Sequence, residues 1–313
     1  MLRLSVLIPV AGRLSYLEDT LLSVLEAQPE GCRVIVVLDE PYADPWGLKD
    51  ELRFIEAGPG CSLGRAIALG LAEVETPVTF VLPCGHEVEA NWADQAPQIF
   101  EDERIAAVVP LAVRHDSPGV VVAAGVGYRQ DIGRLVPLQE GVACGNTVLA
   151  RRTQILPHSA GAFFRTESIR KIPLDAELGE EWVLAAAVRA LHSAGYLSVL
   201  EPSSRVRARR FPRTADAFRD ARDAEAFFWQ WWDGAPSLPV AARHVGQVLG
   251  RAVAALPRGN LLAELSGRLS GAGTVARRTV AHQRHGMQGP HFNVSRTSAH
   301  TADQVGRDRF ARS

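Results

Sequence analysis

The sequence predicts an α/β fold in which helices flank a central, mostly parallel sheet. Short runs of apolar, β-branched residues recur near the start of the chain, as they do in strands that are buried on both faces. Segments with the apolar spacing of amphipathic helices separate these runs. This alternation of strand and helix is typical of a parallel sheet with right-handed crossovers. Of the 313 residues, 47% are hydrophobic and 22% are charged, so the chain can bury a core of ordinary size.

The first two predicted strands belong to the N-terminal part. Residues 4–10 read Leu-Ser-Val-Leu-Ile-Pro-Val, a buried strand that ends in a turn. A helix is predicted over 14–27, where the apolar positions are Leu17, Leu21, Leu22, Val24 and Leu25. The second strand, over 33–38, is equally apolar, and Asp39 stands at its carboxyl end.

The following segments continue the alternation. A helix over 63–74 leads to a third buried strand over 78–82, which ends at Pro83-Cys84-Gly85. The remaining predictions are a helix over 92–100, a strand over 105–111, irregular strands and loops over 114–154, a helix over 180–194 and a last strand over 197–200. In parallel sheets ligands bind outside the carboxyl ends of the strands. The expected binding region therefore comprises 9–13, 39–42 and 83–87.

The chain changes in character after Pro202. A helix is predicted over 215–232, with Thr214 as its N-cap, and a second helix over 240–256. From residue 271 the chain is mostly Gly, Arg, His, Thr and Ser, which predicts a disordered tail. The predicted division is a domain over 1–202, a helical extension over 203–270 and a basic tail over 271–313.

Charge is divided unevenly between these parts. From Arg205 onward there are 18 Arg, no Lys and 8 Asp and Glu, a net charge of about +10, so the preceding part carries about −11. Arg243, Gln247 and Arg251 are spaced four apart and form one basic face of a helix. This face could contact an anionic membrane surface or pack on the acidic domain. The predicted helix over 215–232 also carries a cluster of aromatic residues, Trp229, Trp231 and Trp232. These tryptophans could stack on sugars or bases, or form the core of the extension.

Other features narrow the expected location and partners. No run of 18 or more uncharged apolar residues is present, so no membrane-spanning helix is expected. The N-terminal residues do not have the pattern of a signal peptide. The four cysteines are scattered, which indicates reduced thiols in a cytoplasmic protein, with peripheral contact to the inner face of the membrane as an extension of this prediction. Arginine without interleaved aromatic residues gives no reason to expect nucleic acid as a partner.

Several short motifs occur in an order that resembles family 2 glycosyltransferases. They are the opening strand with Pro9-Val10-Ala11-Gly12-Arg13, the strand that ends at Asp39, the helix after Ser62, Asn91-Trp92, Ser-Ala-Gly-Ala-Phe-Phe-Arg at 159–165 and Gly179-Glu180-Glu181-Trp182. The resemblance covers residues 2–202. It implies a GT-A type fold that binds a nucleotide-diphospho-sugar and transfers the sugar, with inversion, to a glycan or lipid-linked acceptor in polysaccharide biosynthesis.

The same resemblance implies a set of donor-binding residues. They are Pro9, Ala11, Arg13, Asp39, Arg65, Cys84 and Gly85. A carboxylate such as Asp39 suits hydrogen-bond donors of a base or ribose, and the alternative is an aspartate that caps the turn after a strand. Gly12 would allow close approach of the backbone to a ligand. Arg13 and Arg65 could pair with phosphate, or Arg13 could be an ordinary surface residue at a helix start.

Glu181 aligns with the catalytic aspartate of the family, so the resemblance makes it the general base, with Glu180 beside it as a second candidate. Asp175 is an alternative base if the alignment shifts. Both glutamates could instead stabilise the first turn of their helix through its dipole. Gly161 and Trp182 are assigned to the acceptor side by the same resemblance.

The metal-binding motif of the family is absent at its expected place. Related enzymes carry Asp-x-Asp after the third strand to hold a divalent cation at the diphosphate, whereas this chain has Pro83-Cys84-Gly85 there. His86 and Glu87 follow directly, but two adjacent residues without further ligands make a poor site. The sequence thus predicts no required metal, with Mg²⁺ or Mn²⁺ as the alternative.

Two functions from different classes follow. The first is an active glycosyltransferase in which arginines neutralise the leaving group. The second is a catalytically inactive relative that binds a nucleotide sugar, a glycan or a protein partner. The ordered motifs favour the first function, and the missing Asp-x-Asp favours the second.

Overall fold

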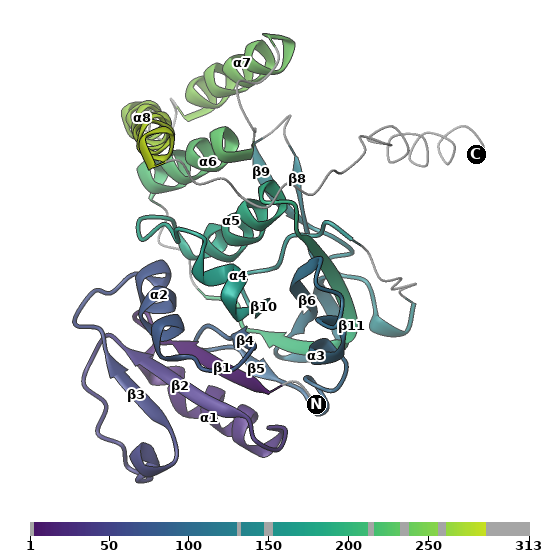
Figure 1. Cartoon of the computed structure of the whole chain (residues 1–313). Helices are drawn as coiled ribbons and strands as arrows, with labels where there is room; N and C mark the ends of the chain where they lie inside the picture. Colours follow the sequence, from purple (N-terminus) through teal and green to yellow (C-terminus); the bar gives the residue numbers. More distant parts are fainter. Residues whose placement is uncertain are drawn as a thin grey trace.

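Nine strands form one curled sheet with helices packed on it (Figure 1). The structure is a computed structural model, and it describes residues 3–129, 133–146, 153–211, 216–231, 238–255 and 261–285. The strand order is β3-β2-β1-β4-β10-β6-β11-β5, with β7 paired to β6, while β8 and β9 form a separate two-stranded sheet. The predicted α/β fold with a mostly parallel central sheet is confirmed.

The N-terminal half of the sheet is wholly parallel. Its strands are β1 (Leu4–Pro9), β2 (Arg33–Leu38), β3 (Arg53–Glu56) and β4 (Val78–Val81). The helical segments between them are η1 (Leu14–Tyr16), α1 (Leu17–Glu26), η2 (Leu48–Asp50) and α2 (Leu63–Glu73). The register pairs Pro9 of β1 with Val37 of β2, and Leu7 with Val81 of β4. The carboxyl ends of these three strands therefore lie side by side.

The other half of the sheet mixes directions. It contains β5 (Glu87–Val88), β6 (Ile105–Arg114), β7 (Ser117–Ala123), β10 (Ala162–Arg165) and β11 (Leu197–Ala208). β10 enters antiparallel between β4 and β6, and β11 lies parallel to β6 with a bulge between Glu201 and Arg205. The last strand was expected to end at Leu200, but it continues to Ala208. The predicted boundary at residue 202, between the first domain and the helical extension, thus falls inside β11.

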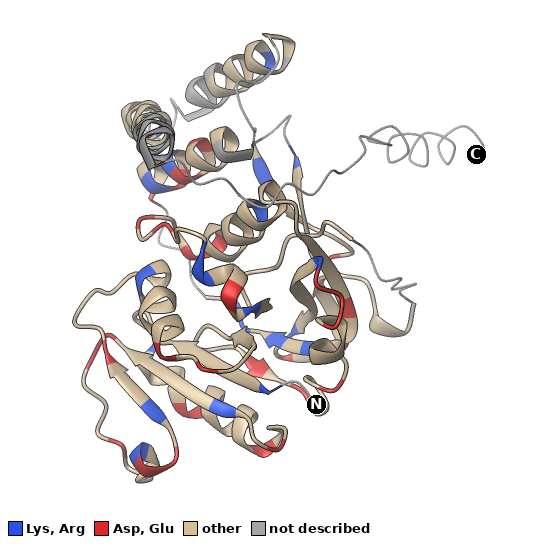
Figure 2. Cartoon of the chain, in the orientation of Figure 1, with Lys and Arg blue, Asp and Glu red and all other residues tan. Residues whose placement is uncertain are grey.

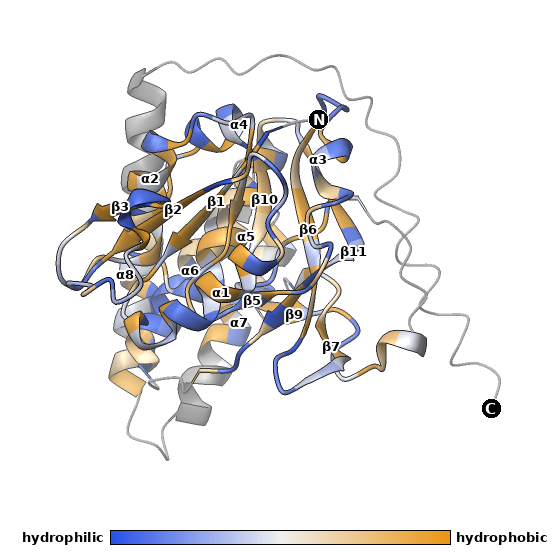
Figure 3. Ribbon diagram, turned by 90° about the horizontal axis from the view of Figure 1, so that it is seen from below, coloured by the Kyte–Doolittle hydropathy of each residue, from blue (hydrophilic) through white to orange (hydrophobic). Residues whose placement is uncertain are grey.

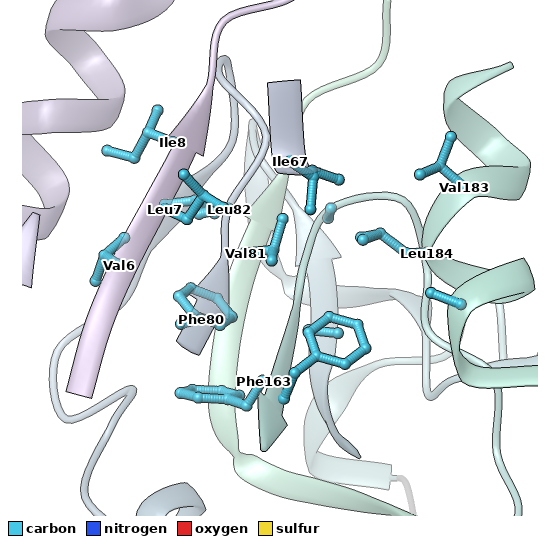
Figure 4. Close-up of a cluster of buried hydrophobic side chains, with 14 of the residues drawn as sticks. Val6, Leu7, Ile8, Ile67, Phe80, Val81, Leu82, Phe163, Val183 and Leu184 are labelled. Atoms are coloured by element: carbon cyan, nitrogen blue, oxygen red, sulfur yellow. The ribbon is translucent and has the colours of Figure 1, made fainter. Parts of the chain in front are cut away.

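The core lies where β1, β4 and β10 meet α2 and α5 (Figure 4). The rings of Phe80 and Phe163 lie 4.2 Å apart between centroids, and Trp92 lies 4.7 Å from Phe80. All three side chains are fully buried. Figure 3 shows the central strands as the most hydrophobic part of the chain. Burial of such aromatic rings contributes strongly to stability because each removes a large apolar area from water.

Strand alternation assigns each residue of β1 and β2 to one face of the sheet. The side chain of Leu7 fills the space at Gly70 of α2, since a Cβ at that glycine would lie 2.1 Å from a Leu7 methyl carbon. Odd-numbered residues of β1, and those of β2 through the register with Leu7 and Ile35, therefore face α2. Asp39 follows the last residue of β2 directly, in the bend after the strand.

Two predicted elements differ in extent from those observed. The helix expected over 92–100 is reduced to α3 (Ala96–Ile99), because Trp92 is anchored in the core by its indole N–H, which donates to the Ala27 carbonyl at 3.1 Å. Asn91 has a positive φ of +62°, so the backbone turns just before Trp92. β3 was not predicted, because it is a short, half-exposed edge strand without an apolar run.

Further elements complete the fold. They are β8 (Val126–Arg129), β9 (Arg134–Pro137), η3 (Cys144–Asn146), α4 (Thr166–Arg170), α5 (Glu180–Ser193), α6 (Ala217–Trp231), α7 (Leu238–Ala255) and α8 (Leu261–His285). α8 extends past residue 270, where the helical extension was expected to end. Its glycines explain the close packing: a Cβ at Gly267 would lie 2.2 Å from the Phe218 carbonyl oxygen of α6, and one at Gly271 would lie 2.3 Å from the Arg222 carbonyl oxygen. Thr214, Trp232 and 286–313 lie outside the described residues.

A buried charged cluster joins the three C-terminal helices. Glu225 of α6 accepts hydrogen bonds from His244 of α7 at 2.9 Å and from Arg268 of α8 at 2.8 Å. Trp229, one of the predicted aromatic cluster, is half-buried and donates its indole N–H to Glu225 at 2.8 Å. Removing one partner of such a cluster leaves a buried charge without compensation, so the cluster fixes how the helices pack.

Among the described residues, no helix is long and apolar enough to span a membrane. Arg243 and Gln247 of α7 are exposed, and so is Leu238, while the side chain of Arg251 is not described. Contact of this side with an anionic membrane stays a prediction. Figure 2 shows acidic residues along the loops that border β2 and β3.

The packing of β10 on β4 can be tested at Gly161. Its φ is +149°, and a Cβ there would lie 2.8 Å from the Val81 carbonyl oxygen. We expect Gly161→Ala to lower the free energy of unfolding by about 1–3 kcal/mol, measured by urea denaturation. Gly119→Ala is the control, because nothing lies within 4 Å of that position and it carries no positive φ. Equal stability of the two variants would contradict this packing.

Candidate functional site

The carboxyl ends of β1, β2 and β4 converge on one place. The backbone N–H of Val10 donates to Val37 O at 2.9 Å, and that of Cys84 donates to Pro9 O at 3.0 Å. These bonds join the loops that follow the three strands, and they hold most of the predicted donor-binding residues together. Crevices at such strand ends are the usual ligand sites of open α/β sheets.

Asp39 is the centre of this region on the β2 side. Only 5% of the residue is exposed, and its Oδ2 accepts the backbone N–H of Gly12 at 2.5 Å. Its Oδ1 is buried and has no hydrogen-bond partner among the described residues. Buried carboxylate oxygens are almost always paired, so this oxygen is open to a donor from water or from a ligand.

The loop after β1 has an unusual backbone that serves this contact. Ala11 and Gly12 both adopt left-handed conformations, with φ of +47° and +79°. The turn directs the Gly12 N–H at Asp39, and it costs energy at Ala11, which carries a Cβ. Such local strain persists where the surroundings impose it, as at binding sites.

Arg65 lies at the start of α2, near Asp39. Ser62 caps this helix by accepting the backbone N–H of Arg65 at 3.4 Å, and the Arg65 side chain is exposed. Burial raises the pKa of the Cys61 thiol, while the charge of Arg65 lowers it and that of Asp39 raises it. Cys61 therefore lies within electrostatic range of both Arg65 and Asp39, in the region beside the start of α2.

Arg13 reaches across the site from the β1 loop. It forms an ion pair with Glu180, and its guanidinium lies 3.5 Å from the centroid of the Phe211 ring. Its Nη1 also donates to Cys84 O at 3.5 Å. Burial lowers the pKa of Arg13, and the charge of Glu180 opposes this shift. The arginine is thus a largely desolvated cation at the end of β4, and its predicted surface alternative does not fit.

The start of α5 brings Glu180, rather than Glu181, to Arg13. Successive helical residues point about 100° apart, and Glu181 is exposed on the adjoining side of the helix. Burial raises the pKa of Glu180, whereas the nearby Arg13 lowers it. The N-terminus of α5 is held from α6, because Asp223 accepts the backbone N–H of Gly179 at 2.8 Å.

The segment after β11 covers the end of β4. Gly85 has a φ of +91°, and a Cβ there would lie 2.4 Å from the Phe211 ring. Phe211 also contacts Tyr16 and His86 edge-on, each at 5.5 Å between ring centroids. Only glycine at position 85 leaves room for this ring.

Arg209 fixes the same segment in place, and it was not among the predicted site residues. Its Nη2 donates to Asp19 and to Glu87, each at 3.0 Å, and lies 2.9 Å from His115 Nε2. Its guanidinium also lies 4.8 Å from the Tyr16 ring centroid. A signal existed in the alternation of arginines at 205, 207 and 209, which is typical of a strand with one polar face.

The residues at the end of β4 do not suit a divalent cation. Cys84 is fully buried, burial raises its pKa to about 12, and its thiol lies 3.1 Å from Arg13 O. His86 Nδ1 already accepts the Arg209 N–H at 3.2 Å, and Glu87 is paired with Arg209 and with His115 at 2.6 Å. Within the part of the chain that the structure describes, no group of three or more His, Cys, Asp or Glu could hold a metal.

The residues assigned to the acceptor side lie in the core. Gly161 is buried beneath β4, and Trp182 is 7% exposed, with its ring 5.0 Å from that of Phe227. Asp175, the alternative base, is 8% exposed and accepts the backbone N–H of Glu177 at 2.9 Å. None of these three residues makes a recorded hydrogen bond or ion pair with Arg13.

A separate cavity of about 300 Å³ opens on the other face of the sheet. It is lined by Leu38, Tyr42, Lys49, Leu52, Arg53, Phe54 and Glu56. Leu38, Phe54 and Glu56 are even-numbered and face away from α2, Arg53 reaches the cavity from the edge strand β3, and Asp39 is not among the lining residues.

Comparison with known proteins supports the fold. No family model and no curated protein matches the sequence. A mannosyltransferase from Pyrobaculum calidifontis, solved with GDP-Man and Mn²⁺, is 13% identical at a TM-score of 0.54, covering 90% of this chain and 81% of that one. A crystal structure of GalNAc-T7 with UDP, GalNAc and Mn²⁺ is 16% identical at a TM-score of 0.54, covering 74% of this chain. The match spans about half (48%) of the GalNAc-T7 chain. The chain thus has a GT-A type glycosyltransferase fold.

The state of Cys84 can be tested by alkylation. A buried thiol with a raised pKa is almost wholly protonated at pH 8, and only the thiolate reacts. We expect iodoacetamide to modify Cys84 at least about a hundredfold more slowly in the folded protein than in urea, measured by peptide mass spectrometry. Cys144, which is partly exposed, is the internal comparison. Alkylation of Cys84 as fast as Cys144 would show an accessible thiolate, and with it a possible metal ligand.

Proposed function

We propose that the protein is a glycosyltransferase that transfers a sugar from a nucleotide-diphospho-sugar to an acceptor hydroxyl, with inversion. The observation that carries this proposal is the presence of two groups on adjoining strand-end loops of a GT-A type fold: the buried Oδ1 of Asp39, which has no partner among the described residues, and the largely desolvated guanidinium of Arg13. Membership of family 2 and a glycan or lipid-linked acceptor are part of the same proposal.

Asp39 would bind the nucleoside part of the donor. Its Oδ2 is already held by Gly12, so Oδ1 is the acceptor that remains for an N–H of the base or a hydroxyl of the ribose. A hydrogen bond to a charged acceptor contributes about 1.5–3 kcal/mol, and it would remove the cost of the unpaired oxygen as well. Arg65, at the start of α2, would meet the ribose or the phosphates.

Arg13 would supply the positive charge at the diphosphate. In the two similar structures Mn²⁺ accompanies the nucleotide or nucleotide sugar. The residues of this chain do not fit such a cation, because Cys84 stays protonated and Glu87 is already paired. A guanidinium can bind two phosphate oxygens through parallel N–H donors, and in a desolvated site its charge is little screened.

Glu180 would act as the general base in a single displacement. The acceptor oxygen attacks the anomeric carbon as its proton passes to the Glu180 carboxylate. The bond from that carbon to the diphosphate oxygen breaks, and the nucleoside diphosphate leaves with the electron pair, stabilised by Arg13. The contact of Glu180 with Arg13 favours it over Glu181, which the sequence placed first.

A second candidate function is binding without catalysis. Arg13 is already paired with Glu180, and Phe211 covers Gly85 at the end of β4. These contacts favour a protein that binds a nucleotide sugar, a glycan or a partner without turnover. Measuring binding and turnover separately distinguishes the two functions.

The direct experiment is a binding and hydrolysis screen over UDP-, GDP- and dTDP-sugars, with EDTA and with Mn²⁺. We expect binding and slow donor hydrolysis in EDTA. Binding without hydrolysis, and without transfer to any glycan acceptor, would support the second function. Absence of binding to every nucleotide would sink both, and strict dependence on Mn²⁺ would overturn the role of Arg13.

The role of Asp39 has its own test. In Asp39→Asn the amide oxygen stays with the Gly12 N–H, so an NH₂ group replaces the free acceptor. We expect the Kd for the bound nucleotide to rise about tenfold or more, measured by calorimetry. Glu40→Gln is the matched control, because Glu40 is adjacent and exposed. An unchanged Kd in Asp39→Asn would remove Asp39 from the donor site.

A further inference from the structure

We propose that Arg13 is shared between Glu180 and the donor diphosphate, so that donor binding releases Glu180 from its ion pair and makes it available as the base. This inference rests on the proposed function and adds an order of events to it. The base stays inactive until the donor is bound. The exchange needs no movement of the backbone, because only two side chains change partners.

The geometry makes the two anions compete for one edge of the arginine. Carboxylates and phosphates bind a guanidinium in its plane, through the N–H groups. One flat face of Arg13 lies on Phe211, 3.5 Å from the ring centroid, and Nη1 is directed at Cys84 O. Nη2 is bonded to Glu180. A diphosphate that approaches this edge meets Glu180 there.

The exchange is favourable for electrostatic reasons. A diphosphate carries at least two negative charges against one for Glu180, so it is the stronger partner of Arg13. The Glu180 side chain is 39% exposed, and the Arg13 side chain is 17% exposed. Once it leaves Arg13, the Glu180 carboxylate can be hydrated, because its side chain is partly exposed. Glu180 can therefore turn away without a large loss of stability.

Release changes the proton affinity of Glu180 in a definite direction. In the free protein, burial raises the pKa of this carboxyl group and Arg13 lowers it. When Arg13 binds the diphosphate, Glu180 loses the positive charge that lowers its pKa and gains a negative neighbour that raises it, so the pKa of Glu180 rises. A carboxylate with a higher pKa is a better base. Between its pKa values before and after binding, Glu180 takes up a proton, and above both values it does not.

The other charged groups around Arg13 and Glu180 do not oppose the exchange of partners. The Cys84 thiol beside Arg13 is protonated and carries no charge, because burial raises its pKa to about 12. On α5, Glu181 is the adjacent carboxylate, and from α6 Asp223 and Arg222 form an ion pair at the start of the helix. Asp223 holds Gly179 through its backbone N–H, so the start of α5 stays in place while Glu180 rotates.

Such coupling would impose an order on the reaction. Before the donor is bound, the base is neutralised by Arg13. Once the diphosphate occupies Arg13, Glu180 is free to accept the proton of the acceptor hydroxyl. By linkage, anything that removes Glu180 from Arg13 must strengthen diphosphate binding by the same free energy.

The test is calorimetric titration of the nucleoside diphosphate that the wild type binds, with EDTA, between pH 5 and 7, in two buffers of different ionisation enthalpy. The heats give both Kd and the number of protons taken up. Because the terminal phosphate also titrates, the decisive quantity is the difference in proton uptake between wild type and Glu180→Gln. We expect Glu180→Gln to bind about three- to tenfold more tightly and to lose the additional proton uptake.

Glu181→Gln is the matched control, since it removes the same charge from the next helical position and should leave both quantities unchanged. Glu180→Ala serves as the second variant and should behave like Glu180→Gln. Equal Kd and equal proton uptake in wild type and Glu180→Gln would overturn the exchange while leaving the proposed function intact. A wild type that binds no nucleoside diphosphate would overturn both.

Discussion

Arg13 is the cation on which the candidate site depends. It links the loop after β1 to the first turn of α5 through Glu180, to the end of β4 through Cys84, and to the segment after β11 through Phe211. No other described residue of the site touches all four segments in the recorded contacts. Its burial makes the charge effective, because a guanidinium shielded from water interacts more strongly with an incoming anion.

The C-terminal helices contribute to the site although they lie away from it. Asp223 of α6 accepts the backbone N–H that precedes Glu180, and Phe227 packs on Trp182. α6 is itself fixed to α7 and α8 through the buried Glu225. The extension therefore acts as a support for the start of α5, which explains why its core is built from aromatic rings and a buried ion cluster.

The sequence predicted the parallel half of the fold well, because buried parallel strands leave a strong local signal. It also located Asp39 and Arg13, which stand directly after such strands. It missed β3, whose residues are half-exposed, and the extension of β11, whose arginines fell within the predicted helical extension over 203–270. It placed Glu181 before Glu180, since the rotation of a helix about its axis is set by tertiary packing. Phe211 and Arg209 acquire their roles only through contacts distant in sequence.

The most direct test of the account is a crystal structure of the protein with a bound nucleoside diphosphate, grown with EDTA. The account predicts diphosphate oxygens within hydrogen-bond distance of the Arg13 guanidinium, a donor group of the nucleoside on Asp39 Oδ1, and a Glu180 side chain that has left Arg13. A nucleotide bound in the cavity lined by Tyr42 and Phe54, or a diphosphate that leaves the Arg13–Glu180 pair intact, would contradict it.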